Sequence, residues 1–494
     1  MSKISLSPNA SGTGTFTIQS PAGNTNRTFT LPDEDGELSV GGGGGGSIDL
    51  VASGAISNGD IVGLNVDGTV STVLNQFPDL QDIDVEDYPA AAYDSVNNKI
   101  LVVYKKGSHN MYGVVGTISG REITFGPETT VFTHTHFFYQ THLAFDPAAG
   151  KFVVLYADGY NAYKMQGNVI TITGNTFTVG AKANNLTNTN TSHIRMAYDE
   201  DNNRLAAVYR KNGYGAFAAL LTISGTTVSL TGETKFGTDS NGNYPSLCYD
   251  TDENQFIAYY LATTSVSKLQ TFSVSGNTIT MNTDYTVNSG AGNSYGIAYD
   301  SVNSRFLAVR QKSTGDFIEF VTGTVSGTTI TFGIVDSNNA YGGDDIKVFY
   351  SPASDNFVVV WDDGPYVATV NIDSGNKIGK IVVEDLSSVD ADLTGQSFAA
   401  YDSDTELFFL GTDNERGSLF DPTSTINSVV GVASEDIADA ATGSITTVGG
   451  TTTSLSGLSP SLYQYVQPDA TVGTKVTTNR LGLATSATNL VVTL

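Results

Sequence analysis

Histidine has the widest chemical range of any side chain in this sequence, and its five copies are unevenly distributed. His134, His136 and His142 lie close together, whereas His109 and His193 stand apart. His134 and His136 would share one face of an extended segment, a spacing that a zinc ion could use. No HExxH pattern accompanies them. We therefore expect solvated or ligand-contacting loop histidines, with no bound metal and no other cofactor.

Two pairs of adjacent carboxylates could support acid–base chemistry. These are Asp344 with Asp345 and Asp362 with Asp363, and two carboxylates that flank a glycosidic bond can hydrolyse it. Adjacent residues of a strand, however, point to opposite faces, and aspartate is also a common turn residue. We therefore predict no catalytic residue and keep glycoside hydrolysis as an alternative.

Aromatic residues are a stronger indication of binding, because they alternate with Asn, Gly and Asp in segments of irregular sequence. Aromatic faces beside amides and carboxylates suit sugar rings, which combine apolar C–H faces with a rim of hydroxyls. Several of these rings are expected to pack between elements instead. The residues that we predict to contact a ligand are His109, His134, His136, Tyr139, Tyr160, Tyr214, Tyr244, Tyr295, Tyr341 and Tyr366.

A repeated residue pair indicates which elements position these side chains. An aromatic residue precedes an aspartate six times, and one degenerate copy fills the gap in the series. The pairs are Tyr93–Asp94, Phe145–Asp146, Tyr198–Asp199, Tyr249–Asp250, Tyr299–Asp300, Tyr350–Ser351 and Tyr401–Asp402. Their second residues are 50 to 53 positions apart. A nearly constant period of this length is typical of repeat architectures.

Every copy of the repeat has the same internal order. The pair ends one strand, a polar turn follows, and an apolar run such as residues 152–156 then indicates a strand buried on both faces. A second turn, centred on a glycine such as Gly225, joins two further strands. Four antiparallel strands in each of seven repeats predict an all-β protein with a seven-bladed β-propeller. A β-solenoid, the alternative, would need a shorter repeat.

The ends of the repeat array predict how the ring closes. The seventh repeat has no room for a fourth strand, so we expect residues 68–73 to supply it. Short turns would lie on one face of the propeller, and the long, variable connections, where binding residues usually occur, on the other. Both ends of the array would leave the ring on the short-turn face.

The remaining sequence suggests a domain organisation. We expect a separate segment at residues 1–40, a glycine linker at residues 41–47, and a small β base domain formed by residues 48–66 and 429–494. The propeller, residues 67–428, would be an insertion in that small domain.

Composition excludes several classes of partner. Lys and Arg number 24 and Asp and Glu 50, so the net charge is −26, and no basic footprint for nucleic acid is visible. The single cysteine, Cys248, excludes an intramolecular disulfide and is expected to fill the core. No stretch is apolar for long enough to predict membrane insertion.

The two flanks resemble known proteins. Ser7-Pro8-Asn9, Ser20-Pro21-Ala22-Gly23-Asn24 and Leu31-Pro32-Asp33 are similar to the N-terminal virion-attachment segment of tail-fibre and other appendage proteins of tailed bacteriophages. Gly457-Leu458-Ser459-Pro460 and residues 481–494 resemble the terminal β domain of phage structural proteins. The resemblance implies a virion protein that is made in the host cytoplasm and contacts other virion proteins through residues 1–40. It also implies a homotrimer, as is usual for fibres.

Together, the resemblance and the loop aromatics predict a virion fibre protein that binds a host cell-surface receptor through the long-loop face. The receptor would be a glycan or a protein. Two alternatives stay open, namely a polysaccharide-degrading enzyme on the same propeller and a capsid decoration fibre without a receptor.

Overall fold

The computed structural model describes residues 46–493 except 65–67, 74–76, 108, 134–136, 238–241, 290–291, 313–316, 339–342, 363–365, 387–394, 424–428, 468–469 and 475–479. The expected N-terminal segment, residues 1–40, and most of the glycine linker lie outside these residues. In the described part of the chain, no helix is long and apolar enough to cross a membrane.

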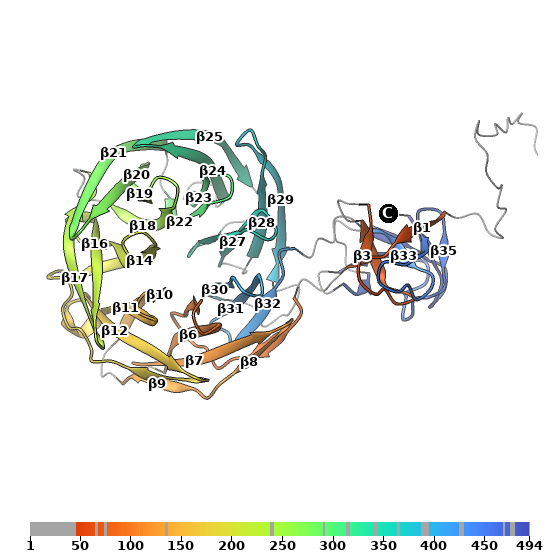
Figure 1. Ribbon diagram of the computed structural model, residues 1–494, viewed down its shortest axis with the longest axis horizontal. Coiled ribbons are helices and arrows are strands. Elements are labelled where there is room, and N and C mark those ends of the chain that lie inside the picture. Colours follow the sequence, from red (N-terminus) through yellow and green to blue (C-terminus); the bar gives the residue numbers. More distant parts are fainter. Residues whose placement is uncertain are drawn as a thin grey trace, which may run out of the picture. The chain divides into compact units, whose positions relative to one another are not determined.

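Seven antiparallel sheets, which we number as blades in chain order, form a ring (Figure 1). The first strand of each blade is innermost and lies beside the first strands of the neighbouring blades. Blade 1 comprises β5 (Ala90–Asp94), β6 (Lys99–Lys106), β7 (Asn110–Ser119), β8 (Glu122–Phe125) and β9 (Thr129–Phe132); blade 2 comprises β10 (Phe138–Asp146), β11 (Lys151–Asp158), β12 (Lys164–Thr173) and β13 (Thr176–Val179); blade 3 comprises β14 (Thr191–Asp199), β15 (Arg204–Lys211), β16 (Gly215–Ser224) and β17 (Thr227–Lys235). Blade 4 comprises β18 (Asn243–Asp250), β19 (Gln255–Thr263), β20 (Val266–Ser275) and β21 (Thr278–Ser289); blade 5 comprises β22 (Gly292–Asp300), β23 (Arg305–Lys312), β24 (Phe317–Ser326) and β25 (Thr329–Asn338); blade 6 comprises β26 (Lys347–Ser351), β27 (Asn356–Trp361), β28 (Tyr366–Ile372) and β29 (Ile378–Asp385); blade 7 comprises β30 (Ser397–Asp402), β31 (Leu407–Thr412), β32 (Arg416–Phe420) and β4 (Leu80–Asp82). The predicted seven-bladed propeller is confirmed, and the antiparallel hairpins exclude a solenoid.

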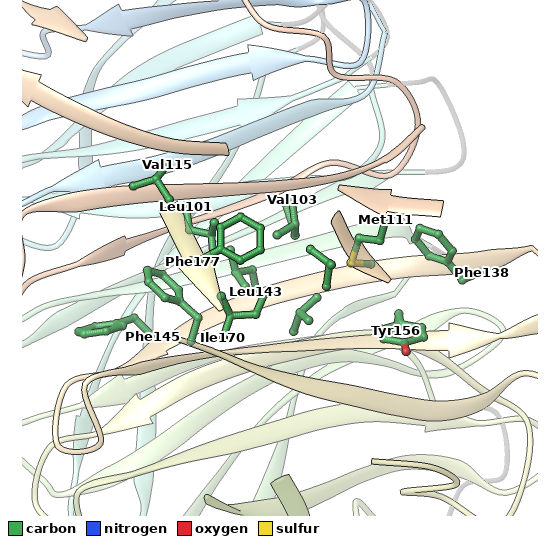
Figure 2. Close-up of a cluster of buried hydrophobic side chains, with 14 residues drawn as sticks. Leu101, Val103, Met111, Val115, Phe138, Leu143, Phe145, Tyr156, Ile170 and Phe177 are labelled. Atoms are coloured by element: carbon green, nitrogen blue, oxygen red, sulfur yellow. The ribbon is translucent and has the colours of Figure 1, made fainter. Parts of the chain in front are cut away.

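Hydrophobic clusters join every blade to the next, one at each of the seven interfaces. Figure 2 shows the cluster between blades 1 and 2, where Leu101 and Val103 of β6 pack with residues of blade 2 such as Leu143. The alternate residues of β6, Ile100 and Val102, pack instead against blade 7. Because each second strand faces a neighbouring blade on both sides, its sequence is apolar without alternation.

The aspartate of the repeated pair organises the first turn of its blade. In blade 5, the buried Asp300 carboxylate accepts hydrogen bonds from the backbone N–H groups of Val302 and Asn303, both at 3.0 Å. The Asn303 side-chain amide donates to the same carboxylate at 2.9 Å. Asp94 and Asp199 make the same three contacts. These are Asx-type turns, in which the side chain replaces missing backbone partners.

In blades 4 and 5, the tyrosine of the pair links its blade to the preceding one. The Tyr249 hydroxyl of blade 4 donates to Asp201 in the first turn of blade 3, at 2.5 Å. Tyr299 of blade 5 donates to Asp252 of blade 4, also at 2.5 Å. Burial, together with hydrogen bonding to Asp402 of blade 7, raises the pKa of Tyr93 in blade 1. The repeated pair therefore forms a turn and also connects adjacent blades.

An N-terminal strand closes the ring, but it is not the expected one. The strand β4 pairs with β32, so that Gln81 lies opposite Gly417. The prediction that residues 68–73 close the ring is wrong, because β3 (Val70–Thr72) pairs with β2 (Ile61–Leu64) and Val70 is buried in the small domain. Since β4 begins and β32 ends at the short turns, both ends of the propeller leave on that face, as expected.

The small domain is built from both flanks of the propeller. One sheet has the order β1-β34-β33-β2-β3, in which β1 is Ser47–Val51, β33 is Val429–Ala433 and β34 is Thr442–Thr446. A second sheet contains β35 (Thr451–Thr452), β36 (Tyr463–Val466), β37 (Val472–Gly473), β38 (Arg480–Ala484) and β39 (Leu490–Val492). Ile61 and Val432 of the first sheet share one hydrophobic cluster with Leu481 and Leu490 of the second. The N-terminal part of this domain extends through β3, beyond the expected boundary at residue 66.

Candidate ligand-binding site at the mouth of the propeller channel

The innermost strands surround a channel, and its opening on the long-loop face contains one equivalent residue from every blade. Each residue lies six positions before the second residue of the repeated pair. These seven residues, which we call the mouth ring, are Tyr88, Gln140, His193, Tyr244, Ser294, Asp345 and Gln396. Together with their neighbours they line a pocket of about 500 Å³.

β-Bulges and an unusual backbone conformation shape the mouth ring. In blades 2 to 5, one extra residue in the first strand interrupts its pairing with the second strand at or next to the mouth-ring position. Five members have φ between 48° and 55°, in the left-handed region that residues with a Cβ rarely adopt. They are Tyr88, Gln140, His193, Tyr244 and Asp345. Bulges re-aim side chains, and strained backbone collects at functional sites, so this conformation marks the mouth as a candidate site.

Neighbouring members of the mouth ring also contact each other. The Gln140 side-chain oxygen accepts a hydrogen bond from the backbone N–H of His193. The His193 and Tyr244 rings lie 4.2 Å apart between centroids. Gln396 accepts from the backbone N–H of Tyr88 at 3.3 Å, which joins blade 7 to blade 1. Two parts of the pocket wall are therefore held by contacts between neighbouring members, which preorganises them for a ligand.

A charged bridge crosses the channel directly beneath the mouth. Arg195 of blade 3 and Asp345 of blade 6 approach to 2.8 Å, and Lys347 donates to the same carboxylate at 2.9 Å. Burial opposes ionisation of Asp345, but Lys347 and Arg195 outweigh it and lower its pKa to about 2. Burial, reinforced by Arg195, lowers the pKa of His142 beside the bridge to about 3. The bridge therefore joins an arginine and a lysine to one ionised carboxylate, with a neutral imidazole beside it at neutral pH.

Asp362 lines the same pocket, but its surroundings favour the neutral carboxyl group, whereas those of Asp345 favour the carboxylate. Its backbone N–H donates to the carbonyl of Asp344 at 3.1 Å, and its buried Oδ1 atom has no hydrogen-bond partner among the described residues. Burial, together with the charge of Asp345, raises the pKa of Asp362 to about 7. One pocket thus holds a firmly ionised carboxylate and a carboxyl group that titrates near neutrality.

The channel continues below the bridge, where both apolar and polar side chains line it. Leu143, Met196, Leu247, Ile297 and Val348, one from each of blades 2 to 6, line a space of about 490 Å³.

The structure brings together only some of the predicted contact residues. Tyr244 belongs to the mouth ring, and Tyr139 and His109 lie beside it in a group of packed rings. Tyr160 and Tyr214 are exposed, with 63% and 55% of their surface accessible, in loops of blades 2 and 3.

Other predicted residues fall elsewhere. The prediction that Tyr295 contacts a ligand is wrong, because only 2% of its surface is exposed and its hydroxyl is hydrogen bonded to Ser267 at 2.7 Å. Tyr366 stacks on Trp361, which is buried in blade 6. His134, His136 and Tyr341 lie outside the described residues.

Six members of the mouth ring were not among the predicted contact residues. Only their position relative to the repeated pair distinguishes them in the sequence. Their residue types differ from blade to blade, so no motif marks them. Their constant offset from the repeated pair would have identified them, because equivalent positions in a propeller face the same axis.

The residues that the structure describes contain no group of three or more His, Cys, Asp or Glu side chains placed to hold a metal ion. Cys248 is buried and unpaired, in agreement with the expectation that it fills the core.

Comparison with known proteins finds only distant structural similarities. No family model matches the chain, and no curated protein matches it. Among solved structures, a periplasmic gluconolactonase of Pseudomonas aeruginosa is 11% identical, with a TM-score of 0.46 over 68% of this chain and 95% of its own. A protein from Lactobacillus plantarum is 12% identical, with a TM-score of 0.46 over 69% and 96%. A chain of a mitotic checkpoint complex is 11% identical, with a TM-score of 0.44 over 69% and 93%. These similarities are too distant to carry an argument about function.

Proposed function

We propose that this chain is a bacteriophage virion appendage protein whose propeller binds a host cell-surface glycan at the mouth ring. One observation carries the proposal: all seven blades contribute an equivalent residue to a single pocket, on the face opposite the two ends of the propeller. A tethered receptor-binding domain needs this polarity, with the chain held at one face and the ligand at the other.

The side chains of the mouth ring favour a carbohydrate ligand. Tyr88 and Tyr244 supply aromatic faces, Gln140 and Gln396 supply amides, and Asp345 supplies a carboxylate. Sugars need this combination of apolar surface and oriented polar groups. The pocket volume of about 500 Å³ is within the range of small-ligand sites.

The virion part of the proposal is supported by the resemblance of the two flanks. Residues 1–40 would bind other virion proteins, the protein would be made in the host cytoplasm, and the assembled fibre would be a homotrimer. Immunogold labelling of intact particles locates the chain, and its mass in solution gives the number of copies.

Competition for adsorption tests receptor binding directly. The purified protein should block adsorption of the phage to its host, and Tyr244→Ala should weaken this block about tenfold, because it removes an aromatic face from the pocket. Val302→Ala is the matched control, since Val302 is exposed in a short turn on the opposite face. Blocking by the Tyr244→Ala protein at full strength would disprove a role for the mouth.

A second candidate function, glycoside hydrolysis, is favoured by the two different carboxyl groups in the pocket. Asp362 holds a proton near neutral pH and Asp345 does not, which is the division of roles between the acid and the base or nucleophile of a glycosidase. Release of reducing ends from host polysaccharide would establish this function, and Asp362→Asn should abolish the release while binding persists.

A further inference from the structure

A group of aromatic side chains adjoins the mouth ring and belongs to blades 1 and 2. We call it the aromatic patch, and its members are Tyr88, His109, Phe137, Tyr139 and Tyr163. Tyr88 precedes β5, His109 precedes β7, Phe137 and Tyr139 lie at the start of β10, and Tyr163 precedes β12. All five positions are at long-loop connections, so residues far apart in the sequence converge on one part of the face.

The rings form a continuous series. His109 and Phe137 have centroids 4.9 Å apart, and Phe137 and Tyr139 are nearly parallel at 6.4 Å. Tyr139 then contacts both Tyr163, at 5.6 Å, and Tyr88, at 5.5 Å. Because Tyr88 is also a member of the mouth ring, the patch and the pocket are joined through one side chain.

The patch is unusually accessible for a packed aromatic group. Phe137 is 51% exposed and Tyr163 is 41% exposed, although both contact other rings. Exposed aromatic surface of this kind costs free energy in water, and on a folded protein it commonly marks an interaction site. Since several faces are already ordered by mutual contact, a ligand would bind without having to immobilise them.

The ammonium group that lies over the patch is paired with a carboxylate. The Lys105 ammonium lies over the Tyr88 ring at 4.9 Å and over the Phe137 ring at 6.0 Å, and it forms an ion pair with Asp87. The cation that lies over these rings is therefore paired with a carboxylate, and the whole chain has a net charge of −26. Both facts disfavour a polyanion such as a nucleic acid, which needs a basic groove beside its stacking platforms.

We infer that the patch is a second subsite for the same ligand, so that the chain recognises an extended, uncharged oligosaccharide rather than a single terminal sugar. One sugar residue occupies the mouth, and the following residues of the glycan stack on Tyr139 and Phe137. This inference rests on the proposed glycan binding at the mouth and adds to it the length and charge of the ligand.

The test is the dependence of affinity on chain length. Neutral gluco-, galacto- and manno-oligosaccharides, from the monosaccharide to the hexasaccharide, are titrated into the full chain by calorimetry, with oligogalacturonides as the charged comparison. In at least one neutral series affinity should rise steeply over the first few units, and the charged series should bind more weakly. Length-independent affinity, or preference for the charged series, would overturn the inference.

Substitutions separate the two subsites. Phe137→Ala should lower affinity for the longest ligand about tenfold and leave the monosaccharide unaffected, whereas Tyr244→Ala should weaken all lengths. Equal loss at every length in the Phe137→Ala protein would contradict a separate subsite. In Phe137→Trp, the new exposed indole should shift its emission only with long ligands, because Trp361 is buried. Absence of a shift on saturation with long ligands would count against stacking at this position.

Failure of the inference is distinguishable from failure of the proposed function. If a monosaccharide binds and the protein blocks phage adsorption, but affinity is the same at every chain length, the inference fails alone. If neither binding nor blocking occurs, both fail.

Discussion

Asp362 is a side chain at the mouth whose charge depends strongly on its surroundings. Burial and the neighbouring Asp345 raise its pKa to about 7. The folded protein therefore holds a proton that the unfolded chain releases near pH 4, so the folded state binds more protons between about pH 4 and pH 7. It follows that the contribution of Asp362 to the free energy of unfolding decreases as the pH rises through this window.

Asp362→Asn should remove this dependence. We expect the variant to resemble the wild type at about pH 4 and to have the larger free energy of unfolding at about pH 8, where the wild type must bury a charge. Urea denaturation at both pH values measures the difference. Glu122→Gln, an exposed change in β8, is the control and should give parallel profiles. An equal difference between Asp362→Asn and wild type at both pH values would contradict the shifted pKa.

Among the elements, the first turns and the tyrosines that contact them connect successive blades. Tyr249→Phe removes one hydrogen bond to the Asp201 carboxylate and little else. We expect a loss of about 1–2 kcal/mol in the free energy of unfolding, because hydrogen bonds to charged groups exceed the average in strength. Tyr214→Phe, at an exposed ring, should change it by less than about 0.5 kcal/mol. Chemical denaturation compares the two, and equal effects would show that the inter-blade contact contributes nothing.

The closing strand β4 is short, and the ring depends on its pairing with β32. Gln81→Pro should lower the free energy of unfolding by about 2 kcal/mol or more, because proline fixes φ and cannot donate to the neighbouring strand. Gln81→Ala keeps the backbone donor and serves as the control. Thermal unfolding distinguishes them, and similar midpoints would mean that closure does not depend on β4.

The elements were largely predictable from the sequence, because the repeat fixes both the number of blades and the alternation of turns. The closing strand was not predictable, because its three residues show no clear strand pattern, whereas residues 68–73 do. At the site, the exact position of a residue along its strand decided whether its side chain reaches the pocket. Tyr244 lies six positions before Asp250 and reaches the mouth, whereas Tyr295 lies five before Asp300 and is buried. A shift of one residue on a strand changes the face to which a side chain points. The aromatic patch depends on loop conformation, which no periodicity encodes.

At the scale of the whole molecule, the acidic excess should weaken the fold at low ionic strength. A net charge of −26 produces mutual repulsion, although many of the carboxylates are turn residues with hydrogen-bond partners. Raising NaCl from about 10 mM to about 150 mM shortens the Debye length from roughly 30 to 8 Å. We expect the melting temperature to rise by a few degrees, as measured by differential scanning calorimetry, with an equal osmolality of sucrose as the control. A constant or falling melting temperature would contradict net repulsion.

The position of the two propeller ends has a mechanical consequence. A pull applied at the mouth and resisted at both ends would run along β4 and β32, which lie antiparallel and end at the same face. Such a load pulls β4 and β32 in the same direction and shears β32 against β31, so the hydrogen bonds of that ladder share the force, whereas drawing the two ends apart would open the bonds between β4 and β32 one at a time. A tethered propeller of this topology should therefore withstand tension from a bound surface better than it withstands separation of its own ends. Single-molecule pulling in the two geometries would measure that difference.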